Sequence, residues 1–550
     1  MIIFLIVRGP SPQSTLSQPD LSTAASFQEE YEAWICDVRS KASQLFKFVG
    51  NLEPHIAASV ISNRVQALIS SHGNGEPRDH LYPSNGQLTQ SSEAVRQFEA
   101  LVQPMDNILC GLPSWSLQSP PKHTQDSKEK DGSRAQIRAS TQASLVEVAR
   151  AVVNWNPTYV WLRFRRAQLL DTLKHIWKYD PSTLLQGIDS LMGYLRAPDE
   201  WNNGSIDASG SGRTSGEIVG LRKKSSSSLV AIARHIPQHL VPWLSQLSEA
   251  SRSLLSSDDL LPTIRMHLYE FLSCVATAVD DPVQRANFVR DVLSDAINVI
   301  ESPESQEALI SVESFLASIG VAQAREYPSS VTDQANVKLV TARFSRLFSA
   351  LNQLLSVGKR CHEASRKRPN GGIPMQDQLA ANVIEATQNF PDEGPVSIRD
   401  LAVNDPFVPL WPRVLPNLLK IVAIILRIWR PEHQAILLRD RIQRYALAIS
   451  DDDAYLSRKN DVKSGGVFGE GGTAGSVIPG TDRRDLNLAP RWSSWLNELR
   501  NTCFQMLGMC AGQRVLFAPE MSDVFPQFVS VVTEPESLRA MEHRHFTQYM

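Results

Sequence analysis

Residues 282–301 read PVQRANFVRDVLSDAINVIE, and this stretch shows the pattern that decides the fold. Its apolar side chains recur every three or four residues, at Val289, Val292, Leu293, Ala296, Ile297 and Ile300. This spacing buries one face of an α-helix against its neighbours. Four more stretches between Thr214 and Gly320 repeat the pattern, and no strand-like alternation of comparable length interrupts them. The region therefore predicts five amphipathic helices joined by short turns.

The other four predicted helices carry similar apolar faces. Their positions are Ile218, Leu221, Ser225, Leu229 and Ile232; Leu240, Trp243, Leu244, Leu247 and Leu254; Ile264, Leu268, Phe271, Leu272 and Val275; and Leu309, Val312, Leu316 and Ile319. From these faces we expect a core that includes Leu268, Leu272, Val292, Ile297 and Leu316.

Proline marks the starts of several predicted helices, at Ile236-Pro237, Asp281-Pro282 and Ser302-Pro303. A proline at the first helical position loses no hydrogen bond, and the Asp or Ser before it can cap the free amides. The spacing from Pro237 to Pro282 falls in the range of roughly 40–47 residues for a HEAT or armadillo unit. A single helix pair cannot bury its apolar face, so we expect stacked antiparallel pairs in an all-α solenoid. Such a fold is usually a binding surface.

The apolar periodicity and the content of helix-breaking residues divide the rest of the chain into predicted helical segments and loops. We expect a disordered segment at 1–26, followed by a HEAT-like solenoid at 27–358 with loop insertions near 113–140 and 199–214. An irregular loop at 359–405 and a Gly-rich linker at 451–489 are expected to flank a helix pair at 406–450 that continues the solenoid. The C-terminal solenoid helices are expected at 490–550, with an end that looks truncated. Near the N-terminus, two paired helices are expected to bury an apolar stripe that includes Trp34, Leu45, Ile56 and Val60.

The overall composition limits the partners and the compartment that can be expected for the protein. The 550 residues are 42% hydrophobic and 21% charged with a formal net charge of -3, so a nucleic-acid contact would need a local basic face. Six scattered cysteines without a C-x-x-C pair fit a reducing compartment. The most apolar stretch, 410–429, is interrupted by Arg413, Lys420 and Arg427. We therefore expect it to be a buried solenoid helix, with no membrane insertion.

No catalytic, metal or cofactor site is predicted. His235 and His239 lie either side of Pro237 without a third ligand, which favours polar turn residues over a metal site. The glycines between Gly465 and Gly480 lack the Gly-Lys-Ser/Thr sequence of a phosphate loop. The sequence also shows no arrangement of a nucleophile with a base. We therefore expect a protein that is not an enzyme.

Two basic clusters are the candidate site for cargo or phosphate. Arg163, Arg165 and Arg166 lie on one predicted helix beside Trp161 and Phe164, and a second helix carries Arg222, Lys223 and Lys224. If both clusters faced one concave side, they could hold phosphate groups of an RNA or a phosphoprotein. The alternative is that each cluster is an ordinary solvated helix face.

The central helices resemble a known family. The stretch LLSSDDLL at 254–261, the helices at 264–279 and 284–300, and the stretch 308–320 resemble the exportin five and Msn5 branch of the importin-β (karyopherin-β) superfamily. Collinear helix patterns extend the resemblance to 143–321 and to 491–508. It corresponds to the middle portion of such a protein.

The resemblance implies a HEAT-repeat nuclear export receptor without catalytic activity. Such receptors bind GTP-loaded Ran together with cargo, which is structured small RNA (tRNA or microRNA precursors) or protein, and they contact nuclear pore proteins while shuttling between nucleus and cytoplasm. The family's main Ran-binding region is N-terminal and has no counterpart before Phe27. The alternative is a generic HEAT or armadillo scaffold that organises protein complexes without Ran.

Overall fold

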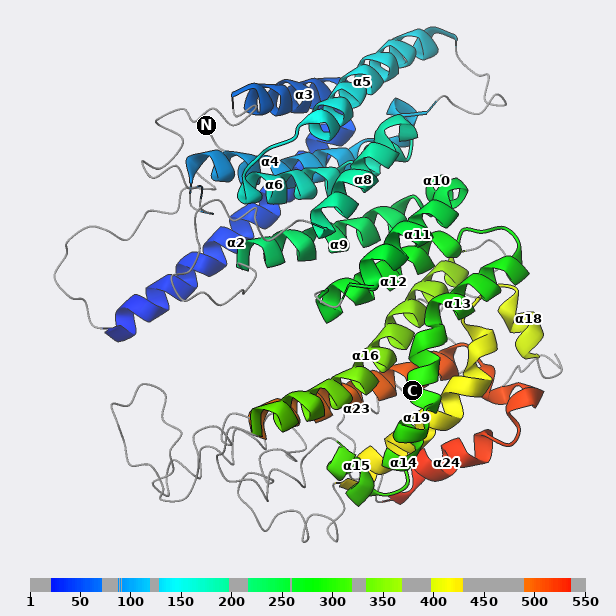
Figure 1. The fold of residues 1–550 in the computed structure, drawn as a ribbon. Coiled ribbons are helices and arrows are strands. Elements are labelled where there is room, and N and C mark those ends of the chain that lie inside the picture. The colour runs from blue at the N-terminus through cyan, green and yellow to red at the C-terminus, as the bar shows by residue number, and fades with distance from the viewer. Residues whose placement is uncertain are drawn as a thin grey trace. The chain divides into compact units, whose positions relative to one another are not determined.

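The computed structural model of the 550-residue chain describes residues 21–71, 88, 90, 92–118, 128–196, 216–257, 260–318, 333–367, 397–428 and 489–535. Within these ranges every regular element is a helix and none is a strand (Figure 1). The predicted all-α solenoid fold is confirmed. The chain divides into two compact units, 1–271 and 272–550.

The first unit stacks its helices in two rows (Figure 1). In one row each helix packs on the next: α2 (Leu21–Leu52), α4 (Glu93–Gly111), α6 (Val160–Thr172) and α9 (Gly216–His235). In the other row α3 (Pro54–Ser71) packs on α5 (Lys128–Asn154), which also contacts α8 (Leu184–Leu195). Shorter elements complete the unit: η2 (Ser114–Ser116), α7 (Lys174–Trp177), η3 (Pro181–Thr183), α10 (Pro237–Leu240), η5 (Val241–Trp243), α11 (Leu244–Leu255) and most of α12 (Pro262–Ala276).

Two glycines allow α2 and α4 to cross with their backbones in contact. A Cβ on Gly50 of α2 would lie 2.6 Å from the carbonyl oxygen of Ile108 in α4. A Cβ on Gly111 of α4 would collide with the backbone of Lys47 in α2. Any larger residue at either position would therefore push the two helices apart.

The second unit surrounds one apolar helix. The helix α19 (Trp411–Ile428) packs on α13 (Pro282–Glu301), α15 (Val312–Ser318), α23 (Ala489–Gly512) and α24 (Phe525–Thr533). The helix α16 (Asp333–Arg366) lies between α13 and α23. Shorter elements are α14 (Pro303–Ala308), α18 (Ile398–Ala402), η7 (Val408–Leu410), η9 (Val515–Phe517) and η10 (Pro519–Met521). Although 408–428 is long and apolar enough to span a membrane, most of it is buried inside the protein.

A buried polar chain fixes the start of α19. The indole Nε1 of Trp411 donates to Oε1 of Gln513 over 2.6 Å, and Gln513 Nε2 donates to Oδ2 of Asp405 over 2.5 Å. The second oxygen of Asp405 accepts the backbone amide of Phe407 over 3.0 Å. Because these three side chains form hydrogen bonds with one another in the protein interior, they fix the orientation of α19 against α23.

The predicted proline starts are confirmed. Pro237, Pro282 and Pro303 are the first residues of α10, α13 and α14. The carboxylate of Asp281 accepts the amide of Val283, and the hydroxyl of Ser302 accepts the amide of Ser305. Ile236 has no side-chain oxygen and provides no such cap.

Several helices extend into stretches predicted as loops. The helix α2 begins at Leu21, inside the predicted disordered segment, and α5 begins at Lys128, inside the predicted insertion at 113–140. The helix α16 ends at Arg366, inside the predicted loop at 359–405, which also contains α18. The polar extensions of α5 and α16 have good helix formers but no apolar face, so periodicity could not detect them. The predicted loop at 199–214, the second helix of 406–450 and nearly all of the linker at 451–489 lie outside the described residues.

The predicted core is largely confirmed. Leu268, Leu272, Ile297 and Leu316 are buried, whereas Val292 is only half-buried. The predicted burial of Trp243 was wrong, because its side chain is 37% exposed. The sequence pattern treated 240–254 as one helix, but the chain runs through α10, η5 and α11 there, and the change of helix type shifts the angular position of this residue. Trp34, Leu45, Ile56 and Val60 were also expected in the core and are exposed.

The glycine crossing gives a direct test of the α2–α4 contact. We expect Gly50→Ala to destabilise the protein by about 1–3 kcal/mol, because the new methyl group meets backbone atoms that cannot rotate away. Gly193→Ala is the matched control, since a Cβ at this helical position meets nothing within 4 Å. The control should be neutral or stabilising by up to about 1 kcal/mol. Urea unfolding of both variants measures the difference, and equal stabilities would contradict the close crossing.

Candidate functional site

The first basic cluster lies on α6, and it includes the buried side chain of Arg166. The guanidinium donates to the carbonyl oxygens of Val152 and Val153 over 3.1 and 2.5 Å. These carbonyls belong to the last turn of α5, where no intrahelical donor is available. Arg166 also donates to the hydroxyls of Tyr194 over 2.7 Å and Ser190 over 3.0 Å, both in α8. One side chain therefore caps α5 and joins it to α6 and α8.

Arg165 and Arg163 also contact groups inside the protein. Arg165 is 3% exposed and forms an ion pair of 2.6 Å with Glu99 of α4. Its other terminal nitrogen donates to Gln168 over 2.8 Å. Arg163 is half-buried and donates from Nε to the carbonyl oxygen of Pro157 over 2.8 Å. Burial lowers the pKa of both arginines, and both remain cations at neutral pH.

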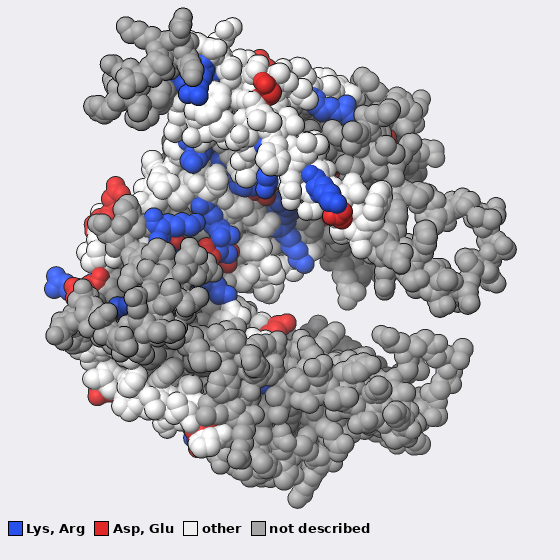
Figure 2. Space-filling view, turned by 180° about the vertical axis from the view of Figure 1, so that it is seen from behind, with Lys and Arg blue, Asp and Glu red and all other residues white. Residues whose placement is uncertain are grey.

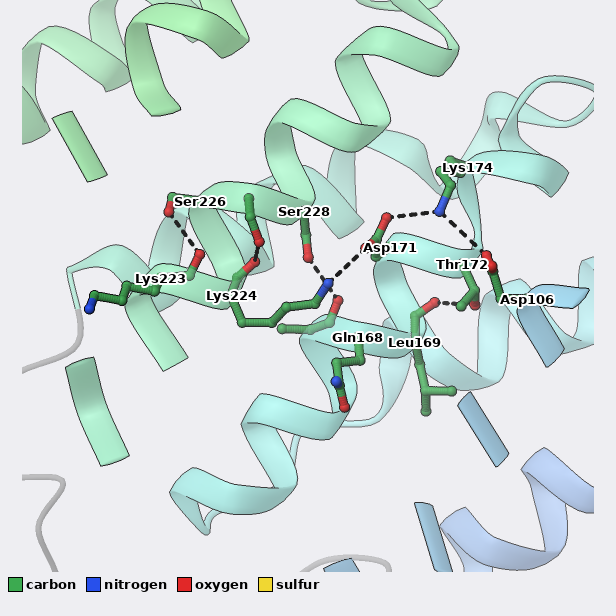
Figure 3. A network of polar contacts seen from close by, with 12 residues as sticks. Asp106, Gln168, Leu169, Asp171, Thr172, Lys174, Lys223, Lys224, Ser226 and Ser228 are labelled. Atoms are coloured by element: carbon green, nitrogen blue, oxygen red, sulfur yellow. Dashed lines mark hydrogen bonds and ion pairs between the residues drawn. The ribbon is translucent and has the colours of Figure 1, made fainter. Parts of the chain in front are cut away.

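The second basic cluster, on α9, contributes one member to a polar network (Figure 3). Lys224 Nζ lies 2.7 Å from Oδ2 of Asp171, whose other oxygen lies 3.0 Å from Lys174. Lys174 in turn contacts Asp106 of α4 over 3.4 Å, and His175 contacts the same carboxylate over 3.2 Å. Alternating charges thus connect α4, α6, α7 and α9, all within the first unit.

The contacts within the network shift the pKa values of Asp106 and Lys174. The hydrogen bond from His175, helped by the charge of Lys174, lowers the pKa of Asp106 from 3.8 to about 2 against the opposing effect of burial. Burial alone would lower the pKa of Lys174, but Asp171 and Asp106 outweigh it and raise this pKa. The contacts therefore hold Asp106 and Lys174 in their ionised forms at neutral pH.

Lys223 is oriented differently from its neighbour. It is exposed, and its side chain points away from the network in Figure 3, whereas Lys224 points into it. Arg222 is half-buried. Among the six predicted site residues, Lys223 is the most exposed, whereas Arg163, Arg222 and Lys224 are half-buried.

The two clusters lie apart on the same pair of helices. Lys224 contacts Asp171, and Ser228 donates to the carbonyl oxygen of Ala167, so α6 and α9 run antiparallel. In this register the level of Lys223 is at about residue 172, nine positions from Arg163. At 1.5 Å rise per residue the separation is about 13 Å along the helices. The two basic clusters therefore occupy separate positions along α6 and α9.

Two further arginines repeat the capping contact, and the sequence did not single them out. Arg265 of α12 donates to the carbonyl oxygen of Leu255, the last residue of α11, over 2.6 Å and to that of Ser257. Arg285 of α13 donates over 2.6 Å to the carbonyl of Val279, just after α12, and over 2.5 Å to that of Val403. Arg166, Arg265 and Arg285 thus each reach back to carbonyls at or just past the C-terminus of an earlier helix.

The described residues contain no group of three or more potential metal ligands. His235 packs edge-on against the ring of His175 with 5.0 Å between centroids, so it takes part in packing. On the face drawn in Figure 2, acidic side chains lie beside several of the lysines and arginines. That pattern agrees with basic side chains that are balanced by neighbouring acids.

These features describe an all-α repeat protein in which Arg165, Arg166 and Lys224 of the two basic clusters connect neighbouring helices. The model of the Exportin-5 family matches residues 5–550, so the chain belongs to this family. No curated protein matches the chain. The family assignment confirms the predicted resemblance and indicates a nuclear export receptor that shuttles between nucleus and cytoplasm. It is a family of transport receptors and not of enzymes.

The role of Arg166 can be tested by stability. We expect Arg166→Met to destabilise the protein by about 3 kcal/mol or more, because several buried groups lose a charged donor and each costs about 1–3 kcal/mol. Lys223→Met is the control and should change stability by less than about 0.5 kcal/mol, since Lys223 is exposed. Chemical denaturation followed by circular dichroism measures both. Equal effects of the two substitutions would show that the carbonyl contacts of Arg166 contribute nothing.

The network predicts a pH dependence of stability. Because the folded pKa of Asp106 is lowered to about 2, its contribution is present above the unfolded value near 3.8 and is lost as pH falls toward 2. We expect Asp106→Asn to be less stable than the natural protein at pH 7 and to approach it below pH 3. Urea unfolding across this pH range gives the difference. A difference that stays constant with pH would contradict the ionised network.

Proposed function

We propose that this chain acts as an export receptor that binds its cargo in a complex with GTP-loaded Ran. The observation that carries the proposal is the match to the Exportin-5 family over residues 5–550. The all-α stack supports it, because helical repeats expose long surfaces that suit macromolecular partners. Contacts with nuclear pore proteins belong to the same proposal.

The cargo surface that we propose includes Lys223, Arg222 and Arg163. These three candidates keep partial or full exposure, whereas Arg165 and Arg166 are buried and Lys224 is bound to Asp171. Few cations are therefore available for phosphates, which favours a modest salt dependence of binding. Structured small RNA or a phosphorylated protein could supply the phosphate.

The test is a binding assay with Ran locked in its GTP form. We expect purified chain to bind a hairpin RNA or a phosphopeptide more tightly when GTP-loaded Ran is present. Lys223→Glu should weaken cargo binding and, for RNA, reduce the slope of log K against log salt by about one. Arg150→Glu is the control, since Arg150 is exposed on α5, whereas the three proposed residues lie on α6 and α9.

The outcomes separate the two candidate functions. Cargo binding that is unchanged by Ran would favour the alternative, a helical-repeat scaffold that works without Ran. An unchanged affinity and salt slope for Lys223→Glu, with both ligands, would remove Lys223 from the cargo surface. In that case the export proposal would depend only on the comparison of cargo binding with and without GTP-loaded Ran.

A further inference from the structure

The turn between α11 and α12 begins with two exposed serines. Ser256 and Ser257 directly follow Leu255, the last residue of α11, and both are exposed. The hydroxyl of Ser256 donates to the carbonyl oxygen of Ser253 over 2.9 Å, in a contact that is itself exposed to solvent. Exposed turns of this kind are the parts of a fold that modifying enzymes reach most easily.

The sequence after Ser256 carries the charges that one class of enzyme recognises. The residues that follow it are Ser257, Asp258 and Asp259, so a carboxylate stands three residues after the hydroxyl. Protein kinases select their substrates by charge patterns around the acceptor, and acid-directed kinases recognise a carboxylate at this spacing with their own basic side chains. The sequence of the turn therefore suits an acid-directed kinase.

Two other described serines share this spacing and are less accessible. Ser144 has Glu147 three residues later, but it is half-buried within the long helix α5. Ser397 has Asp400 at the same spacing, but that carboxylate already accepts the hydroxyl of Ser397 over 2.8 Å. The turn after α11 combines the acidic pattern with an exposed acceptor.

A guanidinium holds the same turn. Arg265 of α12 donates to the carbonyl oxygens of Leu255 over 2.6 Å and Leu260 over 3.2 Å, and to that of Ser257. Ser256 stands between two of these acceptors in the sequence. A negative group added to Ser256 would therefore lie next to the cation that connects α11 to α12.

We propose that Ser256 is a phosphorylation site for an acid-directed protein kinase, and that the phosphate draws Arg265 away from the carbonyl of Leu255. The serine hydroxyl oxygen attacks the γ-phosphorus of a nucleoside triphosphate, and the bond from this phosphorus to the bridging oxygen breaks. The nucleoside diphosphate leaves, and the hydroxyl proton passes to a base of the kinase. This modification is independent of which cargo the chain binds.

The phosphate acts against the turn for two reasons. It carries about −1.5 to −2 charges at neutral pH, and it stands at the C-terminus of α11, where the helix dipole is already negative. Its oxygens also accept from a guanidinium more strongly than a neutral carbonyl does. When Arg265 moves to the phosphate, Leu255 and Ser257 lose this donor, so the connection between α11 and α12 weakens.

The first measurement is mass spectrometry of peptides from the purified full chain after treatment with ATP and an acid-directed kinase of the casein-kinase class. We expect a phosphate on Ser256 and none at this turn in Ser256→Ala. Asp259→Asn should slow the modification by about tenfold or more, because one charged contact with the kinase is lost. A phosphate on Ser257 instead, no phosphate at the turn, or an unchanged rate for Asp259→Asn would each overturn the proposal.

Ser294→Ala is the matched control for the acceptor. Ser294 is exposed on α13 and is followed by Asp295, but the residue three positions later is Ile297. This variant should be phosphorylated at Ser256 like the natural protein. Loss of the Ser256 phosphate in this variant would contradict recognition of the acid at the third position.

The second measurement is hydrogen exchange of the phosphorylated and the untreated full chain. We expect the amides of the last turn of α11 to exchange about tenfold faster or more after phosphorylation, because charge-assisted hydrogen bonds of Arg265 are lost there. The C-terminal turn of α5, which Arg166 holds, should exchange alike in both samples. Equal exchange at α11 with Ser256 fully phosphorylated would overturn the release of Arg265.

Discussion

The structure depends on guanidinium groups that satisfy carbonyl oxygens at or near the ends of helices. A helix leaves its last carbonyls without intrahelical donors, and a repeat protein buries many such ends between neighbouring helices. Arg166 provides the missing donors for α5, Arg265 for α11, and Arg285 for the turn after α12. Because each arginine sits on a later helix, it also fixes the position of that helix against the one it caps.

This role changes how the basic residues are interpreted. A cluster such as Arg163, Arg165 and Arg166 looks like a phosphate site in the sequence, where only charge and spacing can be seen. In the structure Arg165 is paired with Glu99, and Arg166 is occupied by carbonyl and hydroxyl groups. Lys224 is likewise held by Asp171, so the adjacent Lys223 is the member of its cluster left open to solvent. The two clusters thus expose fewer cations than the sequence suggests.

Apolar periodicity and proline punctuation were sufficient to predict the fold class and most of the core. Pro282 with Asp281 and Pro303 with Ser302 start helices for local reasons that the sequence contains. The polar starts of α5 and ends of α16 were not predictable, because a solvated helix has no apolar face. The capping arginines were missed because their acceptors are backbone carbonyls, which leave no sequence signal.

The exposed side chains of α2 show a second limit of prediction from sequence. An apolar stripe predicts that a helix face is covered, but it does not tell whether the cover belongs to the same molecule. Trp34 and Leu45 satisfy the pattern and are exposed. The sequence also could not distinguish Lys223 from Lys224, since their difference arises from Asp171, which lies 53 residues from Lys224.

The most direct test of the central claim is hydrogen exchange followed by mass spectrometry on the Arg166→Met protein. If the guanidinium caps α5 and joins it to α8, exchange should rise at the C-terminal turn of α5 and in the facing turns of α6 and α8. Helices of the second unit should exchange as in the natural protein, because repeats pass losses mainly to their neighbours. Unchanged exchange at Val152–Asn154 would contradict the account.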